Sequence, residues 1–189
     1  MRPNYLFMFL GYPGSGKTYF SERLAKETGA VRINADALRV RLFGTIEAAK
    51  AFDAQTGLLN KITFNALDYA MTQVLVSGNS VICDYQHNAR AMRTARAKVA
   101  TDNDAVPIVV WVQTPRDEAV RRGSERPATL NHRRHSAEKM EALVARTILQ
   151  LEEPDPSEKV IIIDGRLPFT DQYASFQRQL EALVRTGRN

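Results

Sequence analysis

An octet near the start of the chain has the residue types and the spacing of a phosphate-binding loop. Residues 11–18 read Gly-Tyr-Pro-Gly-Ser-Gly-Lys-Thr, which satisfies G-x-x-x-x-G-K-[ST], and they follow the apolar run 5–10 directly. Glycines permit backbone angles at which successive N–H groups point at one anion. The helix expected after the loop adds the positive end of its dipole at the same point.

Two side chains of the octet extend this prediction to a nucleotide and a metal. Lys17 is expected to reach the β- and γ-phosphates, and the Thr18 hydroxyl to ligate Mg²⁺. A plain glycine-rich turn is the alternative, but the four fixed positions match by chance in only about 1% of chains of this length. The predicted nucleotide-binding residues of the loop are Gly11, Pro13, Gly14, Ser15, Gly16, Lys17 and Thr18.

A carboxylate follows the second apolar segment, where the end of a strand would lie beside the phosphate loop. Asp36 there can accept the proton of a hydroxyl that attacks the γ-phosphate. Arg39, three residues further along the same helix face, can bind an acidic group of the acceptor. The alternative is that Asp36 only caps or begins a helix, since carboxylates are favoured there.

Other polar residues follow the third and fifth apolar runs. Asp84 ends the third run and can hold Mg²⁺ directly or through water, or it can be a turn or cap residue. Asn88 and Arg90 lie just beyond it and are candidates for binding the substrate, with ordinary helix-start chemistry as the alternative. Gly165 belongs to a turn after the fifth run, and its backbone is expected to approach the nucleotide base.

Basic residues are concentrated between positions 116 and 135. Arg122 and Arg126 are predicted to belong to a lid over region 116–136 and to stabilise the charge of the transferring phosphate. They would share a helix face if the helix continued to 126, but Pro127 indicates that it stops about there. A solvated basic helix face or a site for a polyanionic substrate is the alternative. The full basic set is Arg116, Arg121, Arg122, Arg126, His132, Arg133, Arg134 and His135. The histidines have no accompanying Cys or carboxylate cluster, which favours loop residues over metal ligands.

The elements that position these residues alternate between strand and helix. Short apolar runs rich in β-branched residues predict strands at 5–10, 31–33, 80–83, 106–112 and 159–163. Helices are predicted at 17–28, 35–43, 46–77 with a break near 56–57, 88–101, 115–125, 136–153 and 169–186. This alternation predicts an α/β three-layer sandwich with a five-stranded parallel sheet, which binds ligands at the carboxyl ends of its strands.

Length and composition limit which class of protein this chain can belong to. The chain has 189 residues, which fits one domain over 1–189, and a net charge of +5. Cys83 is the only cysteine, so an internal disulfide is excluded, and a buried core residue is favoured over a reactive thiol. The first residues are too few for a signal peptide and the apolar run 5–10 is too short for a membrane span, so we expect a cytoplasmic protein. The oligomeric state stays open.

The motifs together resemble those of the P-loop kinases of the 5′-polynucleotide kinase and zeta-toxin type, a group that includes kinases of unassigned substrate. The resemblance covers nearly the whole chain and is carried by the octet with Pro13 and Ser15, by Ile33-Asn34-x-Asp36-x-x-Arg39, by Val81-Ile82-Cys83-Asp84 with Asn88, and by the lid arginines Arg122 and Arg126. It implies ATP and Mg²⁺ as cofactors, Asp36 as general base and Arg39 as a ligand of the acceptor's phosphate. Zeta toxins phosphorylate a UDP-sugar instead of a polynucleotide, and no phosphatase domain follows here, so the motif does not choose the acceptor.

The expected function is therefore transfer of the ATP γ-phosphate to a hydroxyl of a polynucleotide 5′ end, a nucleotide-sugar or a small molecule. A GTPase is disfavoured because no N-K-x-D or T-K-x-D segment is present. An ATP-binding switch or interaction module without an acceptor is the main alternative, but such a protein does not need a base at Asp36. Nucleic-acid binding lacks support, since no aromatic residue stands among the basic ones between 116 and 135.

Overall fold

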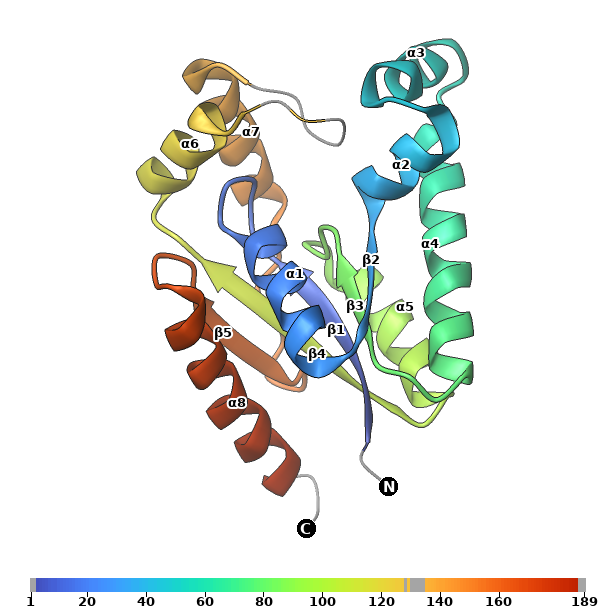
Figure 1. Cartoon of the computed structure of the whole chain (residues 1–189), viewed down its shortest axis with the longest axis vertical. Helices are drawn as coiled ribbons and strands as arrows, with labels where there is room; N and C mark the ends of the chain where they lie inside the picture. Colours follow the sequence, from blue (N-terminus) through green and yellow to red (C-terminus); the bar gives the residue numbers. More distant parts are fainter. Residues whose placement is uncertain (1–2, 128, 130–134, 187–189) are drawn as a thin grey trace.

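A single parallel sheet forms the centre of the molecule (Figure 1). The computed structural model describes residues 3–127, 129 and 135–186. Its five strands lie in the order β2-β3-β1-β4-β5, and every neighbouring pair is parallel. The strands are β1 (Asn4–Leu10), β2 (Val31–Asn34), β3 (Val81–Asp84), β4 (Ala105–Gln113) and β5 (Val160–Asp164). The predicted fold class is confirmed.

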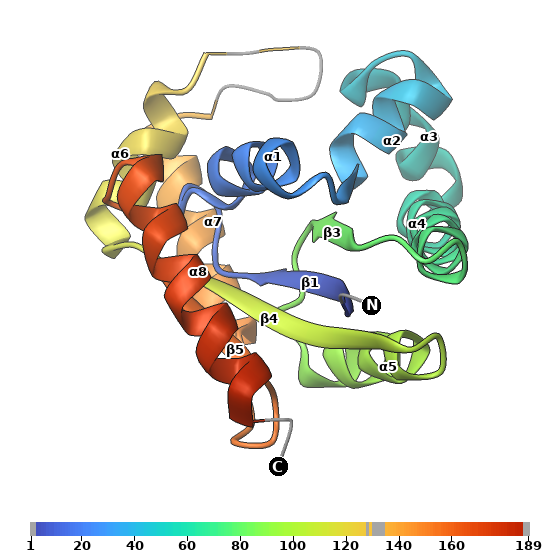
Figure 2. The ribbon, with the colours of Figure 1, turned by 60° about the horizontal axis from the view of Figure 1, so that its bottom comes forward.

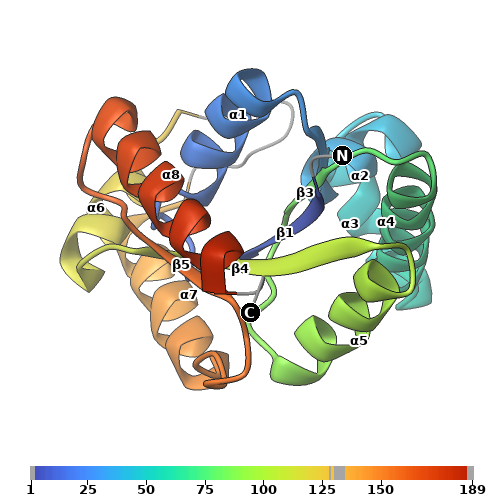
Figure 3. The same cartoon turned by 90° about the horizontal axis from the view of Figure 1, so that it is seen from below.

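Helices cover both faces of the sheet and rise beyond the carboxyl ends of its strands. The helices are α1 (Lys17–Thr28), α2 (Ala35–Phe43), α3 (Ile46–Thr56), α4 (Leu59–Val76), α5 (Arg90–Thr101), α6 (Arg116–Glu125), α7 (Ala137–Gln150) and α8 (Phe169–Thr186). Seen from below, α1 and α8 lie on one side of the sheet, and α5 and α7 lie on the other (Figure 3). The α2–α3 and α6–α7 pairs stand on opposite sides of α1 (Figure 2). This arrangement leaves the strand ends between two helical walls.

Successive side chains of β1 point to opposite faces of the sheet, and each face has its own hydrophobic core. Phe7 and Phe9 pack toward α1 and α8, where Phe20 and Phe176 complete an aromatic cluster. The other β1 side chains, Leu6, Met8 and Leu10, pack toward α4 and α5. Because β1 is buried on both faces, it carries the phosphate loop on the most rigid part of the sheet. Cys83 is a buried member of the second core, and burial raises the pKa of its thiol to about 12.

Local signals explain where several elements begin and end. The long helical segment breaks at Gly57, which caps α3 with a positive φ of 65°, as its composition predicts. Pro107 in β4 lies opposite Leu6 of β1, before the pairing of β4 with β5 starts at Val109, so its missing N–H breaks no bond to β5. The helix predicted over 136–153 ends earlier, at Gln150, because the Glu152 N–H donates to the Asn88 carbonyl at 2.9 Å.

Within the described residues, no helix has both the length and the apolar character that crossing a membrane requires.

Candidate active site

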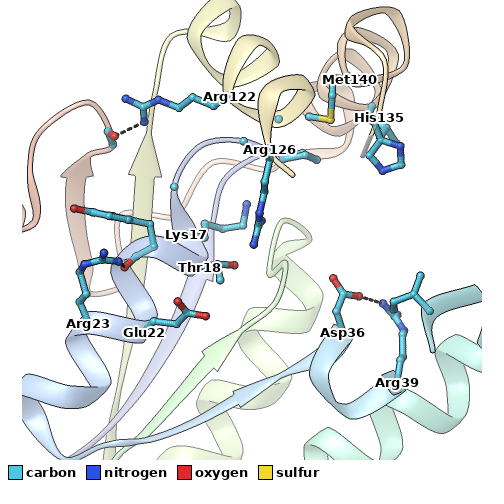
Figure 4. Close-up of a pocket in the computed structure, with 18 of the residues that line it drawn as sticks. Lys17, Thr18, Glu22, Arg23, Asp36, Arg39, Arg122, Arg126, His135 and Met140 are labelled. Carbon is cyan, nitrogen blue, oxygen red and sulfur yellow. Dashed lines mark hydrogen bonds and ion pairs between the residues drawn. The ribbon is translucent and has the colours of Figure 1, made fainter. Parts of the chain in front are cut away.

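One large pocket lies at the carboxyl ends of the strands, with a volume of about 1100 Å³ (Figure 4). Its walls come from the phosphate loop and α1, from α2–α4, from α6–α7, and from the turn after β5. The predicted site residues that line it are Pro13, Gly14, Gly16, Lys17, Thr18, Asp36, Arg39, Arg122, Arg126 and Gly165. Elements distant in sequence therefore bring most of the predicted residues into one cavity.

The phosphate loop depends on its glycines. Gly11, Gly14 and Gly16 have φ values of +136°, +80° and +101°, which L side chains rarely adopt. A Cβ at Gly14 would lie 2.1 Å from the Ala119 carbonyl oxygen of α6. Beneath the loop, the buried Thr114 hydroxyl donates to the Ser15 carbonyl at 2.8 Å. The loop is thus held against β4 and α6 with no room for a Cβ at Gly11 or Gly14, and the positive φ values suit a cradle for phosphate oxygens.

Lys17 lies folded across the loop that it follows. Its Nζ donates to the carbonyl oxygens of Gly11 and Tyr12, both at 2.8 Å. Burial lowers the pKa of this ammonium to about 8, while the nearby Asp84 carboxylate opposes that shift. Phosphate oxygens placed in the cradle would supply a stronger partner for this buried cation than two carbonyls do.

Thr18 and Asp84 form an oxygen pair that fits a magnesium–nucleotide complex. The Thr18 hydroxyl lies 3.4 Å from Asp84 Oδ1, and Asp84 is buried. The other carboxylate oxygen, Oδ2, accepts from Arg32 Nε and Nη2 at 3.0 and 2.5 Å and from Asn34 Nδ2 at 2.9 Å. Because these donors all bind Oδ2, Oδ1 stays directed at Thr18. No group of three or more His, Cys, Asp or Glu side chains suited to a metal occurs among the described residues, which fits Mg²⁺ held mainly by phosphates and water.

Asp36 faces the pocket from the first turn of α2. The capping role belongs to Asn34, whose Oδ1 accepts from the Ala37 N–H at 2.8 Å, so the alternative of Asp36 as the helix cap does not hold. Asp36 Oδ1 pairs with Arg39 Nη1 at 2.9 Å, and its side chain stays 48% exposed. Arg39 Nη2 also donates to Asn60 Oδ1 of α4 at 3.0 Å. Arg39, itself held by Asn60, therefore orients the Asp36 carboxylate, which stays accessible from the cavity.

The two lid arginines do different things in the structure. Arg122 donates to Glu118 at 2.6 Å and to the Gly165 carbonyl at 2.7 Å, which joins α6 to the turn after β5. Arg126 stands just beyond the end of α6, and its side chain points into the pocket toward Lys17 (Figure 4). The helix ends where Pro127 predicts, because α6 stops at Glu125 and the backbone of Arg126 is extended, so the two arginines do not share a helix face.

The rest of the basic segment contributes less positive charge than its sequence suggests. Arg116 pairs with Glu141, and Arg121 pairs with Glu118 and Glu125 on the outer surface of α6. His135 lines the pocket, and the remaining members of the set, His132, Arg133 and Arg134, lie outside the described residues. The neutralised outer arginines do not form an uncompensated surface for a polyanion.

Asn88 and Arg90 do not line the pocket, which corrects the prediction that they bind substrate. Asn88 is buried and its Oδ1 accepts from the Gly11 N–H at 3.3 Å, so it holds the start of the phosphate loop. The Arg90 backbone N–H donates to Glu152 at 2.5 Å, and its guanidinium lies 3.5 Å from Asp155. The physical reason is that the chain after β3 turns beneath the loop, where the His87 N–H donates to the Phe9 carbonyl at 3.1 Å.

Sequence reasoning did not select four residues that the structure places in or beside the site. Arg32 binds Asp84, and Asn60 binds Arg39. Tyr19 and Arg23 line the pocket next to the loop, with the Arg23 guanidinium 3.7 Å from the centre of the Tyr19 ring. For Tyr19 and Arg23, the i, i+4 spacing on the predicted helix was a signal in the sequence that could have identified them. Arg32 and Asn60 carried no comparable signal, because their partners come from distant segments.

Comparison with known proteins places the chain in a family. A family model described as AAA domain matches residues 6–152, which is most of the chain, so the chain belongs to this family. No curated protein sequence matches it significantly.

Solved structures share the fold across nearly the whole chain. A sugar kinase from Janibacter sp. HTCC2649 is 20% identical with a TM-score of 0.67, and the match covers 95% of each chain. A gluconokinase from Sinorhizobium meliloti 1021 is 18% identical with a TM-score of 0.67, covering 97% of this chain and 95% of that one. Kti12 from Chaetomium thermophilum, solved with ADP-AlF3, is 19% identical with a TM-score of 0.70, covering 94% of this chain and 98% of that one. At these identities the likeness establishes a P-loop kinase-type fold.

Proposed function

We propose that the protein transfers the γ-phosphate of ATP to the hydroxyl of an acceptor. The observation that carries this proposal is that the phosphate cradle and the Asp36 carboxylate face the same cavity from two different walls. A protein that only binds ATP has no use for a base on the wall opposite its phosphate loop, and phosphorylation of an acceptor distinguishes a kinase from an ATPase that uses such a base on water. The sugar kinase and gluconokinase neighbours, as their names state, add support at the level of the fold.

The donor half of the pocket would hold the triphosphate. The loop N–H groups and the start of α1 bind phosphate oxygens, and Lys17 exchanges its two carbonyl partners for them. Thr18 and Asp84 would hold Mg²⁺, which neutralises charge on the β- and γ-phosphates. Arg122 already joins α6 to Gly165, so the α6–α7 pair is connected to the turn that we propose as the site of the adenine base.

The chemical step then needs a base and a cation at the transferring group. Asp36 accepts the proton of the acceptor hydroxyl, whose oxygen attacks the γ-phosphorus while the bond to the ADP oxygen breaks. Arg126 points at this region and stabilises the charge that spreads over the equatorial oxygens.

The test compares Asp36→Asn with wild type and with Asp171→Asn. Asp171 also stands in the first turn of a helix, α8, but is exposed and away from the pocket. Phosphoryl transfer from radiolabelled ATP should fall by about 10²–10⁴ in Asp36→Asn, the usual contribution of a positioned base, while ADP binding stays unchanged. Asp171→Asn should match wild type. Full transfer activity in Asp36→Asn would remove Asp36 as the base, and steady hydrolysis without any phosphorylated acceptor would favour the ATPase or interaction module.

A further inference from the structure

Charge is distributed unevenly between the two halves of the pocket. The donor half, formed by the loop, α1, α6 and the turn after β5, is lined by five cations and one carboxylate: Lys17, Arg23, Arg122, Arg126, Arg166 and Glu22. The acceptor half is formed by α2, α3 and α4. Its described lining contains two carboxylates and two cations, Asp36, Asp53, Arg39 and Lys50, with Asn60 and the apolar Ile46, Ala49 and Leu59. The described lining of the acceptor half is therefore balanced in charge, whereas that of the donor half carries a net positive charge, even though Arg122 and Arg166 pair with Glu118 and Asp164.

Arg39 is the residue on which recognition of a phosphate-bearing acceptor would depend, and both of its terminal nitrogens already bind neighbouring side chains. Nη1 binds Asp36 at 2.9 Å and Nη2 binds Asn60 at 3.0 Å. The third nitrogen, Nε, is buried and has no hydrogen-bond partner. The side chain as a whole is only 18% exposed. A phosphate bound to this guanidinium would share it with the Asp36 carboxylate, so two anions would depend on one cation.

The other charges of the acceptor half do not replace it. Asp53 Oδ1 accepts from the Leu59 N–H at 3.1 Å, which fixes a second carboxylate on this wall at the start of α4. Lys50 is exposed and is the only other cation of this half among the residues that the structure describes. Arg126 lies across the pocket and points at Lys17, on the donor side (Figure 4). In the described lining, an acceptor that carries its own phosphate would thus meet two carboxylates, an arginine paired with one of them, and one exposed lysine.

We propose that the acceptor is a small uncharged polyhydroxy compound of the sugar or alditol class, and that Arg39 positions Asp36 instead of binding a phosphate of the acceptor. This inference rests on the proposed phosphotransfer function. A hydroxyl both donates and accepts hydrogen bonds. The carboxylates can accept from it, the lysine can donate to it, and the amide can do either. The apolar side chains beside them suit the C–H faces of such a compound. The role that family resemblance implies for Arg39 is replaced by one in which it acts through Asp36.

A panel of matched acceptors tests the substrate class. Radiolabelled ATP is offered with free hexoses, pentoses, alditols and nucleosides, and in parallel with sugar monophosphates, UDP-sugars and 5′-hydroxyl oligonucleotides. We expect transfer to at least one uncharged compound, with kcat/KM at least tenfold above that of any phosphate-bearing member. A preference for a phosphate-bearing member would overturn this inference while leaving the phosphotransfer function intact. Absence of transfer to every member, with steady ATP hydrolysis, would overturn both.

Kinetics of Arg39 variants, measured with the best acceptor of that panel, test its role separately. Because Arg39 holds the base in place, Arg39→Gln should lower kcat by about ten- to a hundredfold and leave the acceptor KM within twofold. Arg39→Lys, which can still pair with Asp36 but cannot also reach Asn60 in the same geometry, should recover part of kcat. Arg41→Gln, at an exposed position of the same helix outside the pocket, is the matched control and should change neither constant. An acceptor KM raised tenfold or more by Arg39→Gln, with kcat unchanged, would show that Arg39 binds the acceptor.

Discussion

Replacement of Gly14 by alanine tests whether the phosphate loop depends on its contact with α6. Gly14 has a φ of +80°, and an alanine Cβ there would lie 2.1 Å from the Ala119 carbonyl oxygen, whereas real Cβ contacts essentially never fall below 3.0 Å. The loop and α6 must therefore separate by about 1 Å, and a displacement of this size at a reacting centre lowers turnover by about 10²-fold. The left-handed backbone adds about 1–2 kcal/mol of strain for a residue with a side chain.

That strain also weakens nucleotide binding. If the substituted loop relaxes in the free protein, ADP binding must restore the strained conformation, and each 1.4 kcal/mol of that penalty lowers affinity about tenfold. Calorimetric titration of Gly14→Ala with ADP and Mg²⁺ should therefore show an affinity at least about tenfold below wild type. Turnover would be followed in the same preparations.

Gly29, the residue that caps the C-terminal end of α1, provides the matched control. It has a φ of +71°, and a Cβ there would have no atom within 4 Å. Gly29→Ala should cost about 1 kcal/mol of unfolding free energy from backbone strain alone, measured by urea denaturation, and leave ADP affinity unchanged. Wild-type ADP affinity in Gly14→Ala, or an equal loss in both variants, would refute the argument from the contact with α6.

Three further predictions concern the metal site, a buried ion pair and a buried histidine. Asp84→Asn should reduce the gain in ADP affinity that Mg²⁺ provides, with no loss of affinity in EDTA; an unchanged gain would remove Asp84 from the metal site. Arg93 is fully buried and binds Glu158 at 2.7 Å, so the variant Arg93→Met should lose about 3–5 kcal/mol of unfolding free energy. The control variant Lys98→Met removes the exposed Lys98–Asp102 pair and should lose under about 1 kcal/mol. Burial lowers the pKa of His87 to about 3 in the folded protein. Below pH ~6.5 the imidazole of His87 is therefore protonated in the unfolded chain but stays neutral in the folded one. The unfolding free energy should fall by about 1.4 kcal/mol per pH unit between that pH and the folded pKa. His87→Gln should lack that component of the pH dependence, and an identical slope in both proteins would contradict it.

The order and type of the elements followed from local signals in the sequence. Apolar β-branched runs, the glycine octet and the helical periodicities predicted all five strands and the break at Gly57. These signals are local because strand burial and helix capping are decided within a few residues. The placement of Asp36 at the same edge of the sheet as the loop also followed, since parallel strands bring their carboxyl ends to one edge. Because β3 lies between β2 and β1, Asp36 faces the loop across the pocket instead of lying beside it.

Predictions about particular partners succeeded less well, because partners are chosen by packing between distant segments. Asn88 was expected in the substrate cleft, but the turn after β3 places it against Gly11 of the loop. Arg39 lies in the pocket as predicted, but its hydrogen bonds to Asp36 and Asn60 were not anticipated. Arg32 reaches Asp84 only because β2 and β3 are neighbours in register. No spacing of residues in the sequence predicts these contacts.

The most direct test of the account is the fate of the radiolabelled γ-phosphate when wild type and Asp36→Asn turn over ATP with the best acceptor. The account predicts that wild type places the label on a hydroxyl oxygen of the acceptor, and that Asp36→Asn lowers this transfer by about 10²–10⁴ while still binding ADP. Label released only as inorganic phosphate, at the same rate in both proteins, would contradict it.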